Sequence, residues 1–387
     1  MSDFPLPSAP DGDMACPNDP DPDATEHSST AGTYNHPQDR LQTGGNDMAF
    51  VVATSERAAG DRVGTVYELT DTASTVRAEV WPTTGLNCVR WQARRPDGSW
   101  AGILFTAPDW ETNPVPTRTG HPILFPFPGR LRDGRLPFEG KTYQLPLNDS
   151  TKSNAIHGFT PRNPWRVVSA TGGDESASVT GHFRLAVDLP AAAELWPGDF
   201  DLQVTYSLHA NCLKVTAEVH NHGPGALPFG LGYHPYFRLP GVTDPDVGRY
   251  VLQANVGRLW EADANNLPTG RTIELQPGLD FRHPRPIGAT ALDHVLTGVT
   301  SVPAPDTGLV ELAVLSHPDT SEQLSIHADP TFRELVLFTP AHRHAVAIEP
   351  YTCSADASNL AARGIDSGWR QINPGEVYKS VVEYRWG

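Results

Sequence analysis

Two titratable side chains stand in settings that suit proton transfer. His234 lies in the segment Gly230–Phe237 (GLGYHPYF), where two glycines, a proline and aromatic residues surround one imidazole. Imidazole, with an ordinary pKa of about 6.5, is the side chain best suited to move a proton at neutral pH. Glu349 follows four apolar residues and precedes a proline, and a carboxylate in such a run needs a partner or a function. Together the two groups could remove one proton and deliver another.

The surroundings of the two groups add detail. Aromatic faces near His234 are surfaces on which the C–H face of a sugar ring packs. If Ala345–Glu349 is a strand, its period of two places Glu349 on the same face as Ala345 and Ala347. Because both alanines are small, we expect space above the sheet beside the carboxylate.

Two further segments carry candidate binding residues. Arg130 ends the proline-punctuated run that begins at His121, and its guanidinium could donate to ligand hydroxyls or close a surface ion pair. His157 precedes Gly158, and a glycine there would let the backbone approach a ligand closely. The alternative for His157 is a buried structural histidine. The sequence alone leaves both alternatives open.

Other chemistries lack their usual patterns. The sequence has no G-x-S-x-G elbow, P-loop, dinucleotide fingerprint or H-E-x-x-H. Cys16, Cys88, Cys212 and Cys353 lie far apart, and His342-Arg-His344 has no acidic or cysteine ligands beside it. We therefore expect no metal and no cofactor, with reduced cysteines in a cytoplasmic protein.

The charge of the chain limits its partners. A formal net charge of -16 and a pI of about 5.3, with no basic run, argue against nucleic acid and anionic membranes. No stretch approaches the roughly 20 apolar residues of a membrane helix. A small neutral molecule suits this composition better.

Strands must position these groups. In Asp201–Leu208 the apolar residues alternate with polar ones, and the alternation repeats over 213–219 after the turn His209–Asn211, which predicts a hairpin. Further predicted strands are Glu334–Phe338, Ala345–Glu349 and Val377–Trp386.

Composition sets the fold class and the domain boundary. The 37 prolines and 34 glycines leave few windows for long helices, and no repeat is evident, so we expect a large antiparallel β-sandwich with few short helices. Residues 1–48 are acidic and poor in large apolar side chains, which predicts a disordered tail, or a true start at Met48. Residues 49–387 are expected to form a single domain.

The four segments described above, taken in chain order from Arg130 through His157 and His234 to Glu349, resemble the aldose 1-epimerase (galactose mutarotase-like) family over about residues 65–386. The resemblance implies an all-β supersandwich, no cofactor, and an isomerase of carbohydrate and hexose metabolism. Its reaction would interconvert the α and β anomers of a free aldose. The expected partner is an aldohexose such as glucose or galactose, bound by a monomer or a homodimer.

The resemblance also assigns roles. His234 in the HPYF segment matches the family's general acid, and Glu349 matches its general base. Substrate-binding positions map onto Arg130, His157 and, in Leu292-Asp-His-Val, Asp293. Relatives often carry Asn-Arg where this chain has Gly129-Arg130, so one sugar contact is missing or supplied elsewhere.

This chemistry requires no other group. Opening a pyranose takes a proton from the C1 hydroxyl and delivers one to the ring oxygen, and closure reverses both steps. Glu349 would have to be ionised at rest and close enough to a histidine for the two groups to titrate together.

Two alternatives remain open. A hexose-6-phosphate 1-epimerase would need convergent arginines, and the chain offers Arg130, Arg132, Arg135 and Arg162 near the candidate segments. A non-catalytic carbohydrate-binding protein on the same fold would keep the aromatic residues and dispense with the acid–base pair.

Overall fold

The computed structural model describes residues 48–387, except 114 and 243–245. By their contacts, Asp47–Gly387 form one compact unit. The acidic tail predicted for residues 1–48 lies, apart from Met48, outside the described residues and stays a prediction. The single domain predicted for 49–387 likewise stays a prediction.

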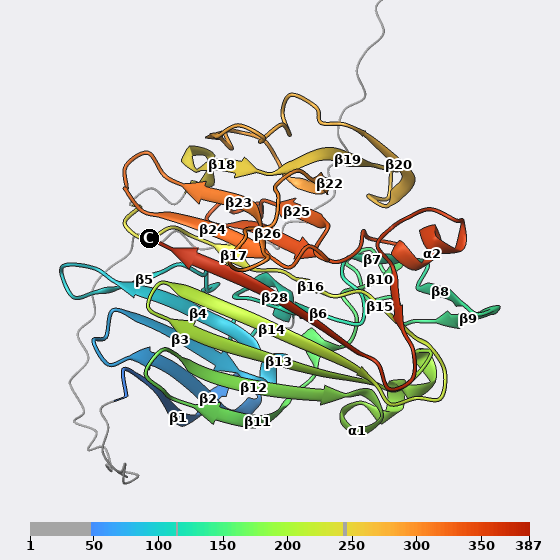
Figure 1. Cartoon of the computed structure of the whole chain (residues 1–387), viewed down its shortest axis with the longest axis horizontal. Coiled ribbons are helices and arrows are strands. Elements are labelled where there is room, and N and C mark those ends of the chain that lie inside the picture. The colour runs from blue at the N-terminus through green and yellow to red at the C-terminus, as the bar shows by residue number, and fades with distance from the viewer. Residues whose placement is uncertain (1–47, 114, 243–245) are drawn as a thin grey trace, which may run out of the picture. The chain divides into compact units, whose positions relative to one another are not determined.

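The largest sheet within the described residues has nine strands, each antiparallel to its neighbours, and extends from β11 near the bottom of Figure 1 to β18 near the top. Its order is β11 (Arg166–Thr171), β12 (Ala177–Arg184), β13 (Phe200–His209), β14 (Cys212–Asn221), β28 (Val377–Trp386), β24 (Gln323–Ala328), β23 (Val310–Ser316), β18 (Val251–Ala254) and β21 (Arg285–Pro286).

A second sheet of the described chain has eight strands and carries the predicted acid–base residues. Its order is β20 (Pro268–Glu274), β19 (Val256–Ala262), β22 (Asp293–Val299), β25 (Glu334–Phe338), β26 (Val346–Tyr351), β16 (Gly232–Tyr233) and β6 (Ile123–Leu124), with β17 (Tyr236–Phe237) also paired to β26.

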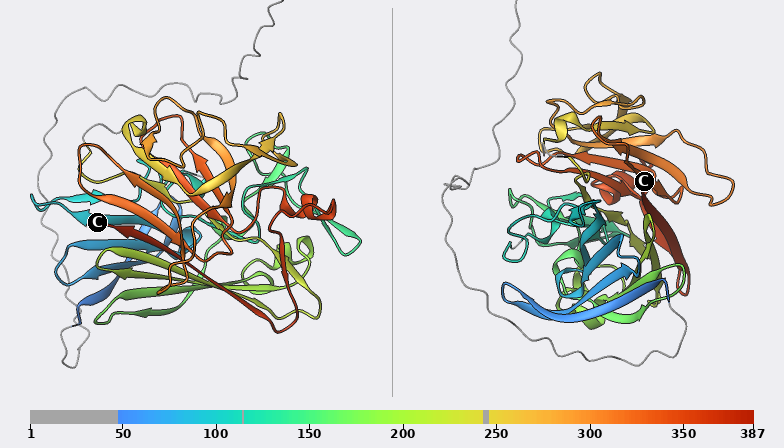
Figure 2. Two further views of the ribbon diagram at one scale, coloured as in Figure 1. Left: turned by 45° about the horizontal axis from the view of Figure 1, so that its top comes forward. Right: turned by 90° about the vertical axis from the view of Figure 1, so that its left-hand side faces the viewer.

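A third sheet has five strands within the described residues: β1 (Phe50–Ala59), β2 (Arg62–Asp71), β3 (Val76–Trp81), β4 (Asn87–Arg94) and β5 (Trp100–Gly102). The first strands of this sheet contact the nine-stranded sheet, since β2 packs against β12 and β13. Figure 2 shows these blue strands beside the green ones.

Short elements complete the described fold. Three strand pairs are β7 (Arg130–Arg132) with β10 (Asn154–Ile156), β8 (Arg135–Phe138) with β9 (Lys141–Gln144), and β15 (Leu227–Phe229) with β27 (Arg370–Ile372). The helices are α1 (Leu185–Asp188), α2 (Ala357–Ala362), and the 3-10 turns η1 (Pro82–Thr84), η2 (Pro116–Arg118), η3 (Thr160–Arg162), η4 (Pro190–Leu195) and η5 (Val247–Arg249). None of the helices in the described residues has the length and apolar character that would let it cross a membrane.

The predicted all-β class, with antiparallel sheets and few short helices, is confirmed. The predicted hairpin is formed by β13 and β14, joined at Ala210 and Asn211. Along β13 the side chains at Leu202, Val204 and Tyr206 are fully buried, whereas the residues between them are partly exposed. This alternation is the pattern that the sequence displays. The strand predicted for Ala345–Glu349 is observed as Val346–Tyr351, which begins one residue later and ends two residues later.

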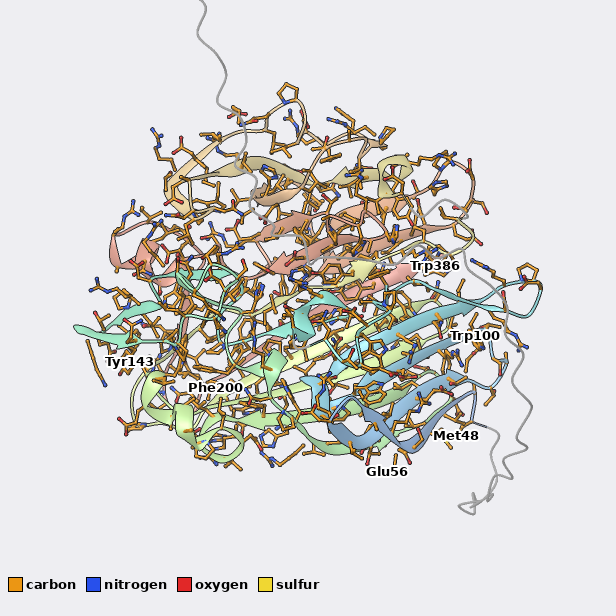
Figure 3. The ribbon with its side chains drawn as sticks, turned by 180° about the vertical axis from the view of Figure 1, so that it is seen from behind. Met48, Glu56, Trp100, Tyr143, Phe200 and Trp386 are labelled. Carbon is orange, nitrogen blue, oxygen red and sulfur yellow. The ribbon has the colours of Figure 1, made fainter. Side chains whose placement is uncertain are left out.

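Side chains extend from the strands throughout the described chain, as Figure 3 shows from behind. The main core draws on all three large sheets. A smaller cluster gathers Trp81, Trp110 and Tyr236 around Ala345 and Ala347, and both alanines are fully buried. Aromatic side chains therefore cover both alanines, which do not face an open surface.

One face of the eight-stranded sheet carries several polar side chains. In the strand register Asp293 is opposite Phe338, Phe338 is opposite Ala347, and Val336 is opposite Glu349. Opposed residues of antiparallel strands point to the same face, so Asp293 and Glu349 share it.

Glu334 on the same face is fully buried. It accepts a hydrogen bond from Trp260 Nε1 at 2.9 Å, and Thr297 is its partner in the strand register. Burial raises the pKa of Glu334 to about 7. The carboxyl group of β25 is thereby bonded to a side chain of β19.

Candidate active site

The backbone around His234 is held on two sides. In β16, Gly232 pairs with Leu124 of β6 and with Tyr351 of β26. Immediately beyond β16, the N–H of His234 donates to the carbonyl of Pro122 at 3.0 Å. The segment that carries the imidazole is therefore fixed between β6 and β26.

His234 and Glu349 are brought into direct proximity. Nε2 of His234 lies 3.3 Å from Oε1 of Glu349, and the two side chains are only 10% and 1% exposed. The ring of Tyr236 stacks on the imidazole, with centroids 4.8 Å apart, and Phe338 meets it edge-on. The predicted proximity of this carboxylate to a histidine is confirmed.

Tyr351 holds the other oxygen of the carboxylate, a contact that the sequence analysis missed. Its hydroxyl donates to Oε2 of Glu349, which leaves Oε1 directed to His234. The sequence spacing could have identified this contact, because Tyr351 is two residues beyond Glu349 on one strand and so lies on the same face.

Burial disfavours the charged form of each member of the pair. It raises the pKa of Glu349 well above its ordinary value, against smaller opposing effects of the Tyr351 hydrogen bond and the Arg130 charge. It lowers the pKa of His234 to about 3. Both directions run against the ionised Glu349 expected at rest. They favour a neutral resting pair, in which Glu349 carries the exchangeable proton and His234 is uncharged. A net charge on the pair would be buried without compensation.

The glycines near these residues serve packing. A Cβ at Gly232 would lie 2.5 Å from the ring of Tyr351, so the glycine makes room for the tyrosine that holds Glu349. A Cβ at Gly158 would lie 2.1 Å from the carbonyl oxygen of Phe125. The close approach expected at Gly158 is thus to the protein's own backbone, which corrects our expectation of a ligand there.

His157 is a second buried imidazole beside the pair. Its ring meets that of His234 at 79° with centroids 5.5 Å apart. Its backbone has a φ of 64°, an uncommon conformation for a residue with a side chain, and its N–H donates to the carbonyl of Gly129. The N–H of Gly129 in turn donates to Nδ1 at 3.2 Å, so the ring proton is on Nε2.

The charge state of His157 follows from its surroundings. Burial lowers its pKa well below 6.5, and the charges of Arg162 and Arg130 act in the same direction, as a charge on His234 would. His157 is therefore a neutral donor at physiological pH. Such a group can hold a hydroxyl without exchanging a proton.

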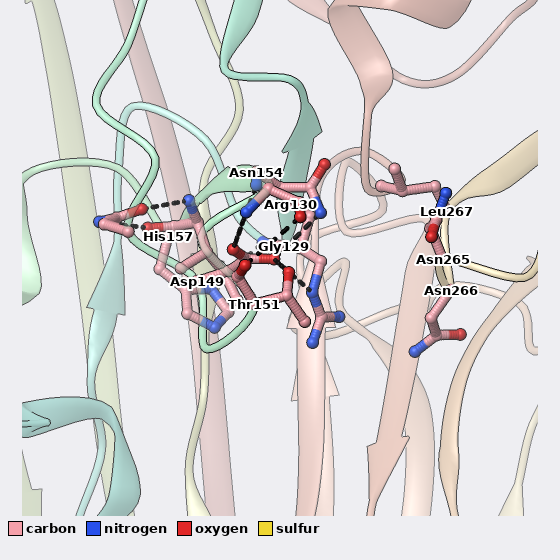
Figure 4. A network of polar contacts seen from close by, with 12 residues as sticks. Gly129, Arg130, Asp149, Thr151, Asn154, His157, Asn265, Asn266 and Leu267 are labelled. Atoms are coloured by element: carbon pink, nitrogen blue, oxygen red, sulfur yellow. Dashed lines mark hydrogen bonds and ion pairs between the residues drawn. The ribbon is translucent and has the colours of Figure 1, made fainter. Parts of the chain in front are cut away.

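Arg130 is placed by β7, opposite Ile156 of β10, the residue before His157. Its Nε lies 4.0 Å from Oδ2 of Asp149, and the side chain is 29% exposed. Asp149 is the centre of the network in Figure 4, where Thr151, Ser153 and Asn154 donate to its carboxylate. This loop network secures the strand pair that carries Arg130 and leads into His157.

Asp293 lies at the exposed start of β22, on the same sheet face as Glu349. It accepts a hydrogen bond from Asn266 Nδ2 at 2.7 Å. Its charge raises the pKa of Glu349, so its field reaches the pair. Asp293 thus stands at the edge of the same group of residues.

The arrangement combines a buried acid–base pair with hydrogen-bonding groups around it. His234, Glu349 and His157 are in contact with one another or nearly so, whereas Arg130 and Asp293 are nearby on neighbouring elements. Within the described ranges, no three His, Cys, Asp or Glu side chains gather as a metal ion would require. The pair can exchange protons with a molecule bound beside it, and the surrounding donors and acceptors can hold hydroxyl groups.

The family of the chain follows from comparison with known proteins. The family model for aldose 1-epimerase matches residues 79–385. The chain therefore belongs to the aldose 1-epimerase family, as its sequence motifs predicted.

Two curated relatives illustrate the range of similarity. The uncharacterized protein YihR of Escherichia coli K12 is 30% identical over 245 residues, which are 63% of this chain and 72% of YihR. The galactose mutarotase of Mus musculus is 27% identical over 173 residues, or 44% of this chain and 47% of the mouse protein. The match thus spans about half the length of the mouse enzyme.

Solved structures agree on the fold. A galactose mutarotase-like protein from Clostridium acetobutylicum superposes with a TM-score of 0.72 at 20% identity, covering 87% of this chain and 98% of the other. Galactose 1-epimerase from Lactobacillus acidophilus gives 0.68 at 20% identity, covering 88% and 99%. At this level of identity the likeness establishes a shared galactose mutarotase-like fold.

Proposed function

We propose that this protein is an aldose 1-epimerase that interconverts the α and β anomers of a free aldohexose. The observation that carries the proposal is the 3.3 Å separation of His234 Nε2 and Glu349 Oε1 in a buried setting. The reaction moves protons at two oxygens bonded to one carbon, the C1 hydroxyl and the ring oxygen. Two proton-transfer groups in direct proximity match that demand.

Glu349 acts as the base and His234 as the acid. The resting pair holds one proton, and its transfer from Glu349 to His234 gives a carboxylate and an imidazolium without changing the net charge. The carboxylate then takes the C1 hydroxyl proton as the imidazolium protonates the ring oxygen, and the C1–ring oxygen bond breaks. Rotation about C1–C2 followed by the reverse transfers forms the other anomer.

The remaining residues hold the sugar. His157 offers its Nε2 proton, Arg130 its guanidinium and Asp293 its carboxylate to hydroxyl groups. Phe338, which is partly exposed and meets His234 edge-on, offers aromatic surface for the C–H face of the ring. These contacts would place C1 and the ring oxygen beside the pair, within reach of both proton-transfer groups.

Polarimetry on freshly dissolved α-glucose and α-galactose tests the proposal. We expect the purified protein to accelerate mutarotation above the spontaneous rate, and the E349Q variant to lose most of that acceleration. A protein that binds these sugars but leaves the rate unchanged would instead be a non-catalytic carbohydrate-binding protein. If the protein accelerates mutarotation of none of the aldoses in a broad panel, the proposed epimerase activity is refuted.

A phosphorylated hexose is the second candidate substrate. The observation that favours it is the set of partners of the Arg162 guanidinium. Its Nη1 donates to the carbonyl of Ile156 at 3.5 Å, and no carboxylate partner is found for it among the described residues. Arg162 also lines a cavity of about 460 Å³ that neither His234 nor Glu349 borders. A guanidinium without a carboxylate partner close to His157 could bind a phosphate.

The other arginines considered for phosphate are less suitable. Arg132 is paired with Asp263 at 2.7 Å and with Asp356 at 3.5 Å. Arg135 borders a separate cavity of about 150 Å³. Glucose 6-phosphate run beside glucose in the same assay, with wild type and an R162Q variant, separates the two substrates. A preference for the phosphosugar that disappears in R162Q would favour the second candidate.

A further inference from the structure

His121 is a fully buried histidine that the proposed reaction does not use. Its Nδ1 lies 3.0 Å from the hydroxyl of Tyr206, and its Nε2 lies 2.9 Å from the hydroxyl of Tyr384. Tyr206 belongs to β13 and Tyr384 to β28, strands of the nine-stranded sheet that are separated by β14. The imidazole therefore links its own segment to two strands of another sheet.

The hydrogen bonds of this group are mutually consistent. The Tyr206 hydroxyl donates to the carbonyl oxygen of His121 at 3.1 Å, so it can only accept from the ring. The proton of the imidazole is then on Nδ1, and Nε2 accepts from the Tyr384 hydroxyl. Burial lowers the pKa of His121 to about 3, which keeps the ring neutral. Every polar atom of the imidazole has a partner.

The residues on either side of His121 hold the backbone of the candidate acid. The carbonyl of Pro122 accepts the N–H of His234 at 3.0 Å, and the carbonyl of Gly120 accepts the N–H of Tyr236 at 3.0 Å. The backbone N–H of His121 itself donates to Asn87 Oδ1 at 2.7 Å. A shift of this segment would therefore carry His234 and its stacked tyrosine with it.

We propose that His121 is a positioning residue for the acid–base pair, which fixes His234 against Glu349 by anchoring the Gly120–Pro122 segment to Tyr206 and Tyr384. The inference rests on the proposed function. Its physical basis is that proton transfer depends steeply on geometry, so small displacements of one group lower the rate more than they lower binding. Paired buried polar groups also favour one arrangement over nearby alternatives.

Three tyrosine-to-phenylalanine variants test this role. Y206F removes a ring contact and the bond to the His121 carbonyl, whereas Y384F removes one ring contact. Y233F is the matched control, because the Tyr233 ring also packs on His121, 5.0 Å away, while its buried hydroxyl has no hydrogen-bond partner within the described chain. All three variants delete one buried oxygen from the same neighbourhood.

We expect Y206F to lower kcat by roughly tenfold with KM within about twofold of wild type, since a positioning defect acts on the reacting geometry. Y384F should give a smaller fall in kcat of the same kind, and Y233F should match wild type. Melting temperatures identify any variant that does not fold. If Y206F does not fold, the comparison of Y384F with Y233F tests the proposal. Equal kcat values in the folded Y384F and Y233F variants, or an effect confined to KM, would overturn the proposal.

A second measurement does not depend on activity. The ring nitrogens of His234, followed by NMR in the full-length protein, should shift in Y206F and Y384F but not in Y233F. If the wild type fails to accelerate mutarotation, the proposed function is wrong, yet this comparison still reports whether His121 sets the environment of His234. Unchanged His234 signals in Y206F and Y384F would refute the positioning role.

Discussion

The segments around His157 and His234 present two equally buried histidines, each 8% exposed as a whole residue, whose rings touch. They differ in their partners. His157 accepts a backbone N–H and has no carboxylate at its side within the described residues, whereas His234 faces Glu349. Burial alone would make both rings inert neutral groups. The carboxylate makes the difference, because it offers His234 a proton to exchange.

Removing that carboxylate should have the largest effect. In E349Q the amide keeps the shape of the side chain but cannot accept the C1 proton, so we expect kcat to fall on the order of 10² to 10⁴ with a modest change in KM. Polarimetry, corrected for spontaneous mutarotation, provides the measurement. Turnover near wild type would show that Glu349 is not the base. The carboxylate would then no longer explain a functional difference between His157 and His234.

Substitution of His234 should rank second. H234N removes the group that protonates the ring oxygen, and we expect kcat to fall by roughly 10²-fold while KM changes little. Progress curves at several sugar concentrations separate the two constants. A rise in KM as the main effect would mean that His234 binds the sugar and does not transfer a proton.

Substitution of His157 should have a smaller effect of another kind. H157N removes a neutral donor, so we expect KM to rise by roughly tenfold, at least as much as kcat falls. The Asn side chain is also compatible with the left-handed backbone at this position, which limits the damage to folding. A loss confined to kcat would show that the two imidazoles have been assigned the wrong way round.

The smallest change is expected when pH is varied around neutrality. A second proton on the pair would charge His234, whose pKa is lowered to about 3, so the acid limb should lie well below 6.5. Loss of the shared proton ionises Glu349, whose pKa is raised, so the alkaline limb should lie well above 4.5. Both limbs belong to the coupled pair. A pH–kcat profile that already declines on the acid side near pH 6.5 would contradict the neutral resting pair.

The sequence predicted the candidate pair because short motifs carry strong local constraints. Glu349 in a strand before proline and His234 among glycines and aromatic residues were both recognisable without coordinates. The β13–β14 hairpin was predictable for a different reason, since a half-buried strand must alternate apolar and polar residues.

What the sequence did not predict depends on contacts between distant segments. The loop residue Asp149 has no unusual local pattern, yet it is the hydrogen-bonding centre beside Arg130. Gly158 suggested a close approach of the backbone to a ligand, but the fold brings the Phe125 carbonyl against it. The pKa directions of the pair also follow from burial, which only the folded chain defines.

The buried Glu334 has a consequence for the stability of the whole protein. Its pKa of about 7 in the folded state exceeds the ordinary 4.5, so the folded chain keeps a proton that the unfolded chain releases as pH rises. The stabilisation is full below about pH 4.5 and is lost by about pH 7, a difference of about 3 kcal/mol at 1.36 kcal/mol per pKa unit. Ionisation of this buried carboxyl group thus destabilises the folded protein as the pH rises. Denaturant titrations of wild type and E334Q at pH 5 and pH 8 should show a smaller pH dependence in the variant.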